Sequence, residues 1–374
     1  MAERILITCT DSMMKQFLEQ HAVYLAENGY AVDAGCSPVL GRFAEISEDL
    51  KAYAGLYKLD MKRTPFSLTN FRGYRQVKRI IRQGNYDIIW TNEPVMGLLT
   101  RLAARKARKK GTRVIYMAHG FHFYRGAPKK NWLLYYPIEK WMAHRTDRLV
   151  TVNEEDDRFA RKHFSCPVYH IHGIGANSEK FHPISAEEQR RRREQMGLSG
   201  PVILNVGELN ANKNQKTAIL AFKEVVKQHP DAKLLIAGKG DEKDALEALA
   251  EKEGLKGKVV FLGYTLELEK YMQISDVEIA CSYREGLPLN VIEAMLCAKP
   301  VVASHNRGHD ELIKDGENGF LVDADDAAAY AAKICGILAS KHDFSKAALR
   351  RAEAYTDRCV RKELAEILLD KELE

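Results

Sequence analysis

The stretch SYREGLPLNVIEAMLCAKPVV, residues 282–302, is the most informative part of this chain. An apolar run typical of a buried strand leads into it, and residues 289–298 then predict a helix that ends before a proline. Glu285 therefore lies in the turn before the helix, and Glu293 lies about one turn inside it. N–H groups at a helix start bind anions, whereas carboxylates accept hydrogen bonds from hydroxyls. The pattern favours a ligand with both phosphates and hydroxyls, such as a nucleotide sugar.

A second segment, VILNVGELNANKN (202–214), predicts another strand, loop and helix start. Gly207 follows the strand, and a glycine there allows the backbone to approach a ligand closely. Lys213 precedes the predicted helix, so its ammonium group and the helix start can both face a diphosphate. The alternative for both segments is ordinary: a surface lysine, a solvated loop glutamate and a helical glutamate without a ligand.

These segments resemble the donor-site motifs of the family 4 glycosyltransferases, which are retaining enzymes with the GT-B fold. Residues 117–156 look like the block that carries the catalytic histidine of that family, and residues 173–183 look like its interdomain linker. The blocks occur in the family order and cover most of the chain from about Tyr86 onward. The subset that the chain resembles most makes bacterial capsular, exopolysaccharide or O-antigen chains.

The resemblance implies roles for individual residues. It implies that His119 and Glu285 are catalytic, with Glu285 touching the transferred sugar. It places the ribose hydroxyls at Glu293 and the nucleobase near Tyr264. The donor-binding residues that it implies are Gly207, Lys213, Tyr264, Glu285, Gly286, Leu289, Asn290, Val291 and Glu293.

Two departures from the family pattern concern the ligands. Many members carry an arginine where this chain has Glu208, and a glutamate cannot bind the donor diphosphate. Lys213 with the backbone amides, or Arg284, would then supply the positive charge. Many members also have a glycine pair in the opening loop of the first domain, where this chain has Thr10 to Met13.

Apolar strand-like runs alternate with helical segments along the chain, which predicts an α/β protein with doubly wound parallel sheets. A length of 374 residues favours two domains. We expect two Rossmann-like domains facing a cleft, with residues 1–178 facing the acceptor and the membrane and residues 179–350 binding the donor. Ligands are expected at the carboxyl ends of the strands. By resemblance, a C-terminal helix at 351–374 crosses back onto the first domain.

Charge is unevenly distributed along the chain. Residues 1–178 carry 28 Lys or Arg against 17 Asp or Glu, whereas residues 179–374 carry 29 against 34. The basic half favours an anionic partner, for which a membrane surface, a lipid pyrophosphate and nucleic acid are candidates. No nucleic-acid-binding motif accompanies the basic residues, so nucleic acid is not expected.

Basic side chains recur at helical spacing in two places, which puts each group on one helix face. A lysine pair also precedes an aromatic run suited to a membrane interface. These are either ordinary solvated faces or surfaces that dock to anionic lipid or the acceptor. The residues concerned are Arg72, Arg75, Lys78, Arg79 and Arg82, then Arg101, Arg105, Arg108 and Lys109, then Lys129, Lys130, Trp132, Tyr135 and Tyr136.

No metal or organic cofactor is expected. Asp323, Asp325 and Asp326 form an Asp-x-Asp pattern that would hold a metal in another glycosyltransferase fold, but here they open a helix, and capping explains them. His119 and His122 are three positions apart, yet the glycine and aromatic residues around them disfavour a metal-binding helix. The seven cysteines lack metal-binding spacing, which indicates reduced thiols.

The location follows from features that the sequence lacks. No apolar run reaches about 18 residues, and the first residues do not have the pattern of a secretory signal. A cytoplasmic protein is therefore expected, peripheral on the inner face of the cytoplasmic membrane.

The resemblance thus implies a retaining glycosyltransferase that moves a hexose or N-acetylhexosamine from a UDP-sugar to a sugar linked to polyprenyl diphosphate. Positive groups would stabilise the leaving diphosphate, whose oxygen takes the proton of the acceptor hydroxyl, so no protein base is needed. The alternatives are a sugar-nucleotide epimerase of the same architecture and a non-catalytic binder of anionic membranes or nucleic acid.

Overall fold

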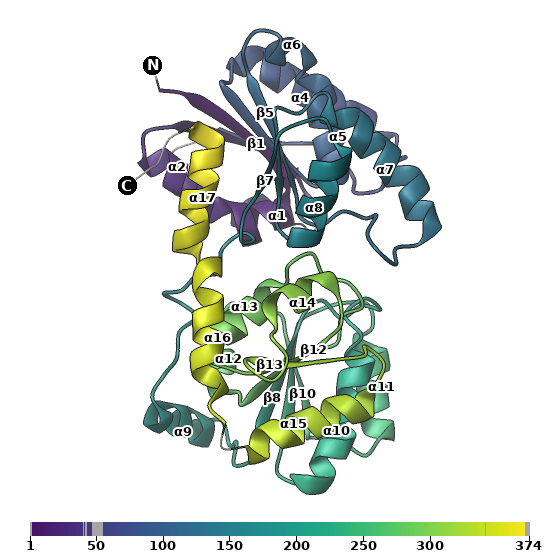
Figure 1. The fold of residues 1–374 in the computed structure, drawn as a ribbon, viewed down its shortest axis with the longest axis vertical. Helices are drawn as coiled ribbons and strands as arrows, with labels where there is room; N and C mark the ends of the chain where they lie inside the picture. The colour runs from purple at the N-terminus through teal and green to yellow at the C-terminus, as the bar shows by residue number, and fades with distance from the viewer. Residues whose placement is uncertain (1, 40, 42, 47–54, 341, 371–374) are drawn as a thin grey trace. The chain divides into compact units, whose positions relative to one another are not determined.

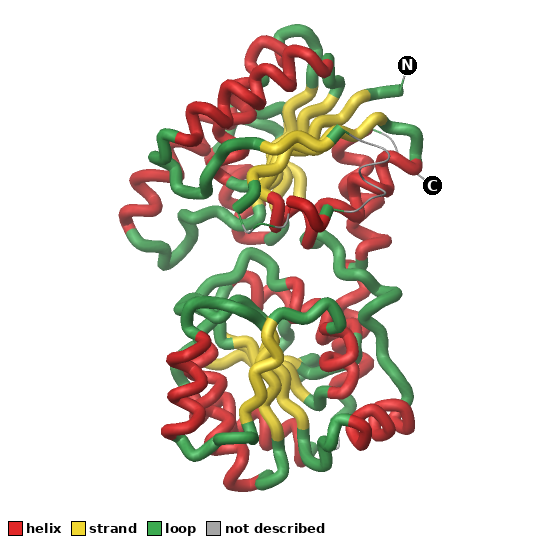
Figure 2. The backbone as a smooth tube through the Cα atoms, turned by 180° about the vertical axis from the view of Figure 1, so that it is seen from behind, coloured by secondary structure: helices red, strands yellow, loops and turns green. Residues whose placement is uncertain are grey.

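The computed structural model describes residues 2–39, 41, 43–46, 55–340 and 342–370. Contacts divide the chain into two compact units, one formed by Met1–Gly175 with Cys359–Glu374 and the other by Ala176–Arg358. Each unit contains a parallel β-sheet flanked by helices (Figure 1; Figure 2). The predicted α/β class with two doubly wound sheets is confirmed.

The sheet of the N-terminal unit has seven strands in the order β3-β2-β1-β4-β5-β6-β7. Its central strands are almost entirely buried, as expected for a parallel sheet that is covered by helices. The short edge strand β3 was not predicted, because two of its three side chains are exposed and give no apolar signal. The strands are β1 (Arg4–Thr10), β2 (Ala31–Ser37), β3 (Leu56–Lys58), β4 (Ile88–Asn92), β5 (Arg113–Ala118), β6 (Arg148–Thr151) and β7 (Val168–His170).

The helices of this unit follow the strands. In the helix Thr69–Gly84, Val77, Ile80 and Ile81 are buried, while its basic residues lie on the opposite, exposed side. The helices are α1 (Asp11–Met13), a π-helical turn (Met14–Leu18), α2 (Glu19–Glu27), a 3-10 turn (Phe43–Glu45), α4 (Thr69–Gly84), α5 (Pro94–Ala103), α6 (Arg105–Arg108), α7 (Lys129–Ala143) and α8 (Glu154–His163).

The sheet of the C-terminal unit has six strands in the order β10-β9-β8-β11-β12-β13. The strands are β8 (Val202–Val206), β9 (Lys233–Ala237), β10 (Val259–Gly263), β11 (Val277–Ala280), β12 (Val301–Ser304) and β13 (Gly319–Val322). The helices are α9 (Ala186–Gln195), α10 (Gln215–Gln228), α11 (Lys243–Lys252), α12 (Leu268–Ile274), α13 (Leu289–Leu296), α14 (Arg307–Leu312), α15 (Ala327–Ala339) and α16 (Phe344–Ala352), followed by a 3-10 turn (Glu353–Tyr355).

Alternating side chains of each strand in this unit enter different cores. In β8, Ile203 packs with α10, α11 and α15, whereas Val202 and Leu204 pack with α13 and α16. This period of two is what a strand with both faces covered requires.

The last helix, α17 (Asp357–Leu369), returns to the N-terminal unit, as predicted. Arg148 donates to the carbonyl of Ile367 and pairs with Asp370, and the ring Nδ1 of His172 lies 2.6 Å from Glu363. Both backbone views show α17 beside α2 (Figure 1; Figure 2). Among the described residues, no helix has both the length and the apolarity needed to cross a bilayer.

Candidate active site

In an open α/β sheet, ligands bind outside the carboxyl ends of the strands, where the strand order reverses. In the C-terminal unit this point lies between β8 and β11. The loops after these two strands carry Lys213 and Glu285, and they are hydrogen-bonded to each other. Tyr283 N donates to Asn212 O at 2.9 Å, and Asn212 Nδ2 donates to Arg284 O at 3.0 Å. Two sequence segments predicted to bind one ligand are therefore neighbours in the fold.

Lys213 and Glu285 are in direct contact. Lys213 Nζ lies 2.8 Å from Glu285 Oε1, and both side chains are largely shielded from solvent. Burial alone would raise the pKa of Glu285, but the charges of Lys213 and His309 outweigh it, so this pKa lies below its ordinary value. Glu285 is consequently an ionised carboxylate at neutral pH.

Two glycines make this close packing possible. A Cβ atom on Gly207 would lie 2.9 Å from Lys213 Cε, so the missing side chain makes room for the stem of the lysine. A Cβ atom on Gly238, at the end of β9, would lie only 1.8 Å from the carbonyl oxygen of Gly207. Both glycines also have φ above +150°, which other residues rarely adopt.

The start of α13 lies next to this ion pair in the chain. Pro288 precedes the helix, and no side chain caps it. Gly286, Leu289 and Asn290 are partly exposed, whereas the Val291 side chain is fully buried in the core. Val291 can therefore face a ligand only through its N–H group, one of those that an α-helix leaves without an intrahelical acceptor.

Tyr264 follows the edge strand β10 and is 39% exposed. It lies at the same edge of the sheet as Gly207, because Gly238 N donates to Gly263 O and Gly207 N donates to Ala237 O. Lys239 Nζ lies 5.8 Å from the centre of the Tyr264 ring. Its position two strands away from β8 separates it from the Lys213–Glu285 pair.

Glu293 lies in a different electrostatic environment from Glu285. Burial first, and then the nearby Glu278 carboxyl, raise the pKa of Glu293 to about 8, with an opposing effect from Lys180. At neutral pH Glu293 is therefore mostly protonated, whereas the sequence analysis treated both glutamates as carboxylates.

The sequence interpretation missed Glu278, a fully buried residue of β11. Its Oε1 atom accepts a hydrogen bond from Asn290 Nδ2 at 2.6 Å, which ties β11 to the first turn of α13. Its Oε2 atom has no partner among the described residues. Burial raises the pKa of Glu278 to about 7, although Asn290 and Lys213 oppose the shift. The sequence did contain a signal for this residue, because Glu278 is an acidic residue within an otherwise apolar strand.

Glu278→Gln is expected to stabilise the C-terminal unit at pH 8 and to change little at pH 5. The folded protein keeps the Glu278 proton up to pH 7, whereas the unfolded chain loses it near pH 4.5, so native stability falls as pH rises between these values. Glutamine stays neutral and keeps an oxygen for Asn290, and a gain of about 2 kcal/mol is expected at pH 8.

Urea titrations at both pH values, followed by circular dichroism, test this expectation. The three tryptophans all precede residue 142, so their fluorescence reports the N-terminal unit and serves as an internal control. A variant that is no more stable than the natural protein at pH 8 would contradict the expectation.

A second cation, Arg307, lies close to Glu285. Arg307 Nε donates to the carbonyl oxygen of Glu285 at 3.2 Å. The start of α14 packs tightly on this loop, because a Cβ atom on Gly308 would lie 3.0 Å from Glu285 Cβ. Glu208, which stands where many members of the family have arginine, is exposed. Arg307 is 99 positions downstream of Glu208, which is why the sequence pattern did not reveal it.

In the N-terminal unit, His119 follows β5 and contacts β4. Its Nε2 atom lies 2.9 Å from Asn92 Oδ1, and Asn92 Nδ2 faces the Thr8 carbonyl at 3.5 Å. Nε2 therefore carries the proton that Asn92 Oδ1 accepts. Burial, with a smaller effect of His21, lowers the pKa of His119 to about 4, so the ring is neutral at physiological pH. A neutral ring can position a substrate but cannot supply a cation.

Glu93, which the sequence interpretation missed, lies where this sheet reverses, between β1 and β4. Its backbone has φ +65°, and its carboxylate accepts from Thr10 N at 2.7 Å and Thr10 Oγ1 at 3.0 Å. Arg63 Nη2 lies 3.4 Å from the same carboxylate and donates to Ser12 Oγ at 2.8 Å. The loop that lacks the usual glycine pair is thus held by Glu93 and Arg63.

Most basic residues on the predicted helix faces are exposed, but Arg101 and Arg108 are exceptions. Arg101 is 2% exposed, and its Nη2 atom lies 2.8 Å from the buried Glu139. The guanidinium also stacks on Tyr116, with its carbon 3.8 Å from the ring centre. The partner comes from α7, which the helix spacing around Arg101 could not show. The exposed residues are Arg72, Arg75, Lys78, Arg79, Arg82, Arg105, Lys109, Lys129 and Lys130, whereas Arg108 is partly buried and bonded to Asp147.

Trp132 is partly buried in an aromatic cluster on α7 and α8. Its ring packs against those of Phe123 and Phe159. The large apolar side chains of α7 that face solvent are instead Leu133, 79% exposed, and Trp141, 49% exposed.

The aspartates after β13 make hydrogen bonds that stabilise the fold. Asp326 Oδ1 accepts from Ala329 N at 2.9 Å and caps α15, as predicted. Asp325 accepts from the Tyr283 hydroxyl and from Asn214. Within the described ranges, no three His, Cys, Asp or Glu side chains are grouped so that they could hold a metal ion.

Comparisons with known proteins agree with this arrangement. Residues 14–174 match the model described as Glycosyltransferase Family 4, and residues 186–354 match the model described as Glycosyl transferases group 1. EpsD of Bacillus subtilis (strain 168), itself assigned as a glycosyltransferase, is 46% identical over 283 residues, which cover 74% of each chain. An Escherichia coli UDP-Gal:alpha-D-GlcNAc-diphosphoundecaprenol alpha-1,3-galactosyltransferase is 27% identical, over 78% of this chain and 71% of its own.

Solved structures of other proteins have the same fold as this chain. Anabaena HepE, solved in complex with UDP, superimposes with a TM-score of 0.80 at 19% identity, over 99% of this chain and 100% of that chain. This match, together with the two doubly wound sheets, confirms the predicted GT-B fold. By its identity to EpsD and its matches to both family models, the chain belongs to the family 4 glycosyltransferases and is a glycosyltransferase.

Proposed function

We propose that this enzyme is a retaining transferase that moves a hexose or N-acetylhexosamine from a UDP-sugar to a polyprenyl-diphosphate-linked acceptor in surface polysaccharide synthesis. The observation that carries the proposal is the Lys213–Glu285 pair, 2.8 Å apart, at the reversal point of the sheet and beside the start of α13. Such a place offers both positive charge and N–H groups to a diphosphate. The Escherichia coli relative, whose name specifies UDP-galactose and an undecaprenyl-linked acceptor, supports the same substrate classes.

In the proposed complex, Lys213, Arg307 and the first N–H groups of α13 stabilise the charge that develops on the leaving diphosphate. Glu285 contacts the transferred sugar, and the protonated Glu293 carboxyl exchanges hydrogen bonds with the ribose hydroxyls as both donor and acceptor. His119 is neutral and positions the reacting centre by a hydrogen bond. The departing phosphate oxygen takes the proton of the acceptor hydroxyl, so no metal and no separate protein base are required.

The basic surface of the N-terminal unit suits an anionic membrane. Arg72, Arg75 and Arg79 are exposed on one side of α4, and Lys129 and Lys130 are exposed at the start of α7. Each basic residue near an anionic surface contributes about 1 kcal/mol. These exposed basic residues support our proposal that the enzyme is a peripheral protein on the inner face of the cytoplasmic membrane.

A screen of nucleotide sugars by thermal shift, followed by transfer assays, tests the proposal. A UDP-sugar present at about 100 times its dissociation constant is expected to add about 2.7 kcal/mol to stability. That same donor is expected to give product only when a lipid-linked acceptor is present. Epimerised sugar nucleotide formed without acceptor, or stabilisation by none of the UDP-sugars, would contradict the proposal.

A further inference from the structure

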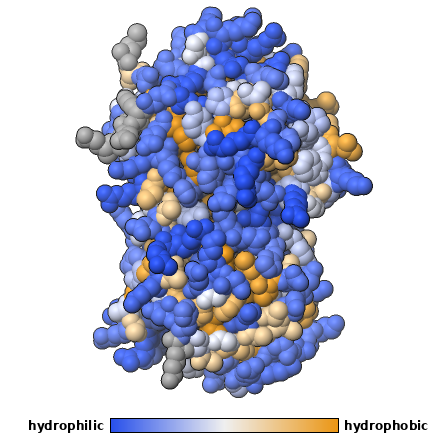
Figure 3. Space-filling view, viewed as in Figure 1, coloured by the Kyte–Doolittle hydropathy of each residue, from blue (hydrophilic) through white to orange (hydrophobic). Residues whose placement is uncertain are grey.

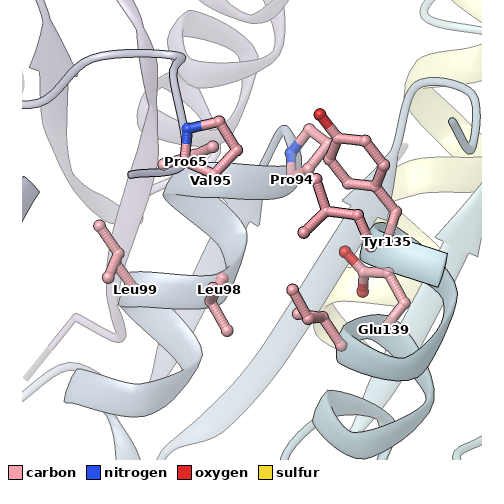
Figure 4. A pocket seen from close by; sticks show the side chains of 9 residues that line it. Pro65, Pro94, Val95, Leu98, Leu99, Tyr135 and Glu139 are labelled. Atoms are coloured by element: carbon pink, nitrogen blue, oxygen red, sulfur yellow. The ribbon is translucent and has the colours of Figure 1, made fainter. Parts of the chain in front are cut away.

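Two glutamates are buried among the described residues, Glu139 and Glu278, and their surroundings differ. Glu139 lines a small apolar cavity of about 50 Å³ between α5 and α7, where it faces Leu98 and Leu99 (Figure 4). Figure 3 shows apolar surface in the part of the N-terminal unit where Figure 1 places these helices. Arg101, 2.8 Å away, balances the charge of Glu139 there. The burial of Glu139 is therefore explained by an ion pair within the fold.

Glu278 lies instead in an apolar core. Its neighbours in the sheet are Leu204 of β8 and Val301 of β12, and both are fully buried. The Oε1 atom of Glu278 accepts from Asn290 Nδ2 at 2.6 Å, whereas Oε2 has no hydrogen-bond partner among the described residues. A buried acid that is only partly satisfied costs stability, and such exceptions to apolar patterning are expected at functional sites.

The bond from Asn290 holds the start of α13 in place of a cap. α13 begins after Pro288 without a side-chain cap, whereas Asn153 caps α8 and Asp326 caps α15. A capping side chain occupies one of the first N–H groups of its helix. The bond between the side chains of Asn290 and Glu278 ties the first turn of α13 to β11 and uses none of those N–H groups.

Glu278 is also linked electrostatically to the proposed donor site. It lies on β11, which with β8 leads into the Glu285 and Lys213 loops. The positive charge of Lys213 acts on Glu278 and opposes the rise of its pKa, which burial brings to about 7. A negative charge buried at this point would repel a diphosphate, whereas the protonated acid accepts from Asn290 without that charge.

We propose that Glu278 is a positioning residue for donor binding, which fixes the first turn of α13 through Asn290 so that its N–H groups face the diphosphate. This role rests on the proposed function, because it assigns the diphosphate to the start of α13. Asn290, predicted among the donor-binding residues, then acts through its own N–H group and by holding the helix to β11.

Isothermal titration with UDP tests the proposal. At pH 6, below the pKa of Glu278, glutamine has nearly the shape and the charge of the natural side chain. Glu278→Gln keeps an oxygen for Asn290 and is expected to bind UDP within about twofold of the natural protein. Glu278→Leu removes that oxygen and lets the first turn of α13 move, so its affinity is expected to fall by about tenfold.

Two further variants separate this bond from a general effect on the unit. Asn290→Ala removes the donor of the same bond, so the double variant with Glu278→Leu is expected to lose no more affinity than either single variant. Glu247→Leu makes the same chemical change at an exposed position of α11 and is expected to keep the natural affinity. Melting curves check that every variant is folded.

The outcomes that overturn the proposal are specific. They are equal UDP affinity of Glu278→Leu and the natural protein, equal losses in the glutamine and leucine variants, or additive losses in the double variant. Failure of the natural protein to bind UDP would instead count against the proposed function, since the comparison among variants requires a donor site.

Discussion

Replacing Glu285 with glutamine is expected to lower the rate of sugar transfer by about a hundredfold to a thousandfold, the effect of removing one preorganised electrostatic group. The carboxylate is ionised, and it holds the Lys213 ammonium at 2.8 Å. Glutamine has nearly the same shape but no charge, so both the contact to the sugar and the position of Lys213 change. The measurement is the initial rate of transfer from the UDP-sugar identified by thermal shift.

Glu208→Gln is the matched control for this experiment. Glu208 lies in the facing loop, one residue after Gly207, and its side chain is exposed. The same chemical change there is expected to leave the rate within about twofold, because exposed charges interact weakly. Equal rates for Glu285→Gln and the natural enzyme would remove Glu285 from the proposed mechanism. Equal vesicle binding by all three proteins would show that the effect concerns catalysis.

Arg101→Ala is expected to destabilise the N-terminal unit by about 3–5 kcal/mol, because it leaves the Glu139 carboxylate buried without its partner. Arg101 is 2% exposed and Glu139 is 5% exposed. Arg101 Nε also donates to Gly97 O at 2.9 Å, so the substitution removes a second bond. Tryptophan fluorescence during urea unfolding measures the change, since Trp90, Trp132 and Trp141 all lie in this unit.

Two further variants test whether the loss of stability comes from the buried ion pair. Arg105→Ala, one helical turn further on, removes an exposed arginine and is expected to cost less than about 0.5 kcal/mol. The double variant Arg101→Met with Glu139→Leu replaces both charges and is expected to recover much of the stability, because no charge is left unpaired. A loss below about 1 kcal/mol for Arg101→Ala would contradict a structural role for the pair.

Local patterns were sufficient for most of the fold. Apolar runs bounded by glycine, asparagine or aspartate predicted twelve strands, because a covered parallel sheet requires continuous burial. The three-residue strand β3 was missed because only one of its side chains is even partly buried. The helix predicted at 351–374 is shorter in the structure, where a 3-10 turn, Glu353–Tyr355, precedes α17.

The residues that we propose for the donor site were predicted from local patterns and from the family resemblance, and the fold brings two of them together. Lys213 and Glu285 are 72 positions apart in sequence, and adjacent parallel strands place their loops side by side. Glu293 was predicted to be a carboxylate like Glu285, but burial, and then Glu278 from the neighbouring strand, raise its pKa and keep it mostly protonated. Arg101 was predicted to lie on an exposed face, either solvated or docked to lipid, yet it is buried and paired with Glu139.

The sequence by itself determined where the strands end, where the helices begin and which residues lie in the loops between them. These features depend on residues that are neighbours in the chain. Only the tertiary structure decided which charges meet: Lys213 with Glu285, Glu293 with Glu278, and Arg101 with Glu139. The physical reason is that the protonation state of an ionisable side chain depends on its burial and on charged or hydrogen-bonding partners within a few ångströms. Those partners come from distant segments, so the protonation and burial of a side chain cannot be read from its own segment.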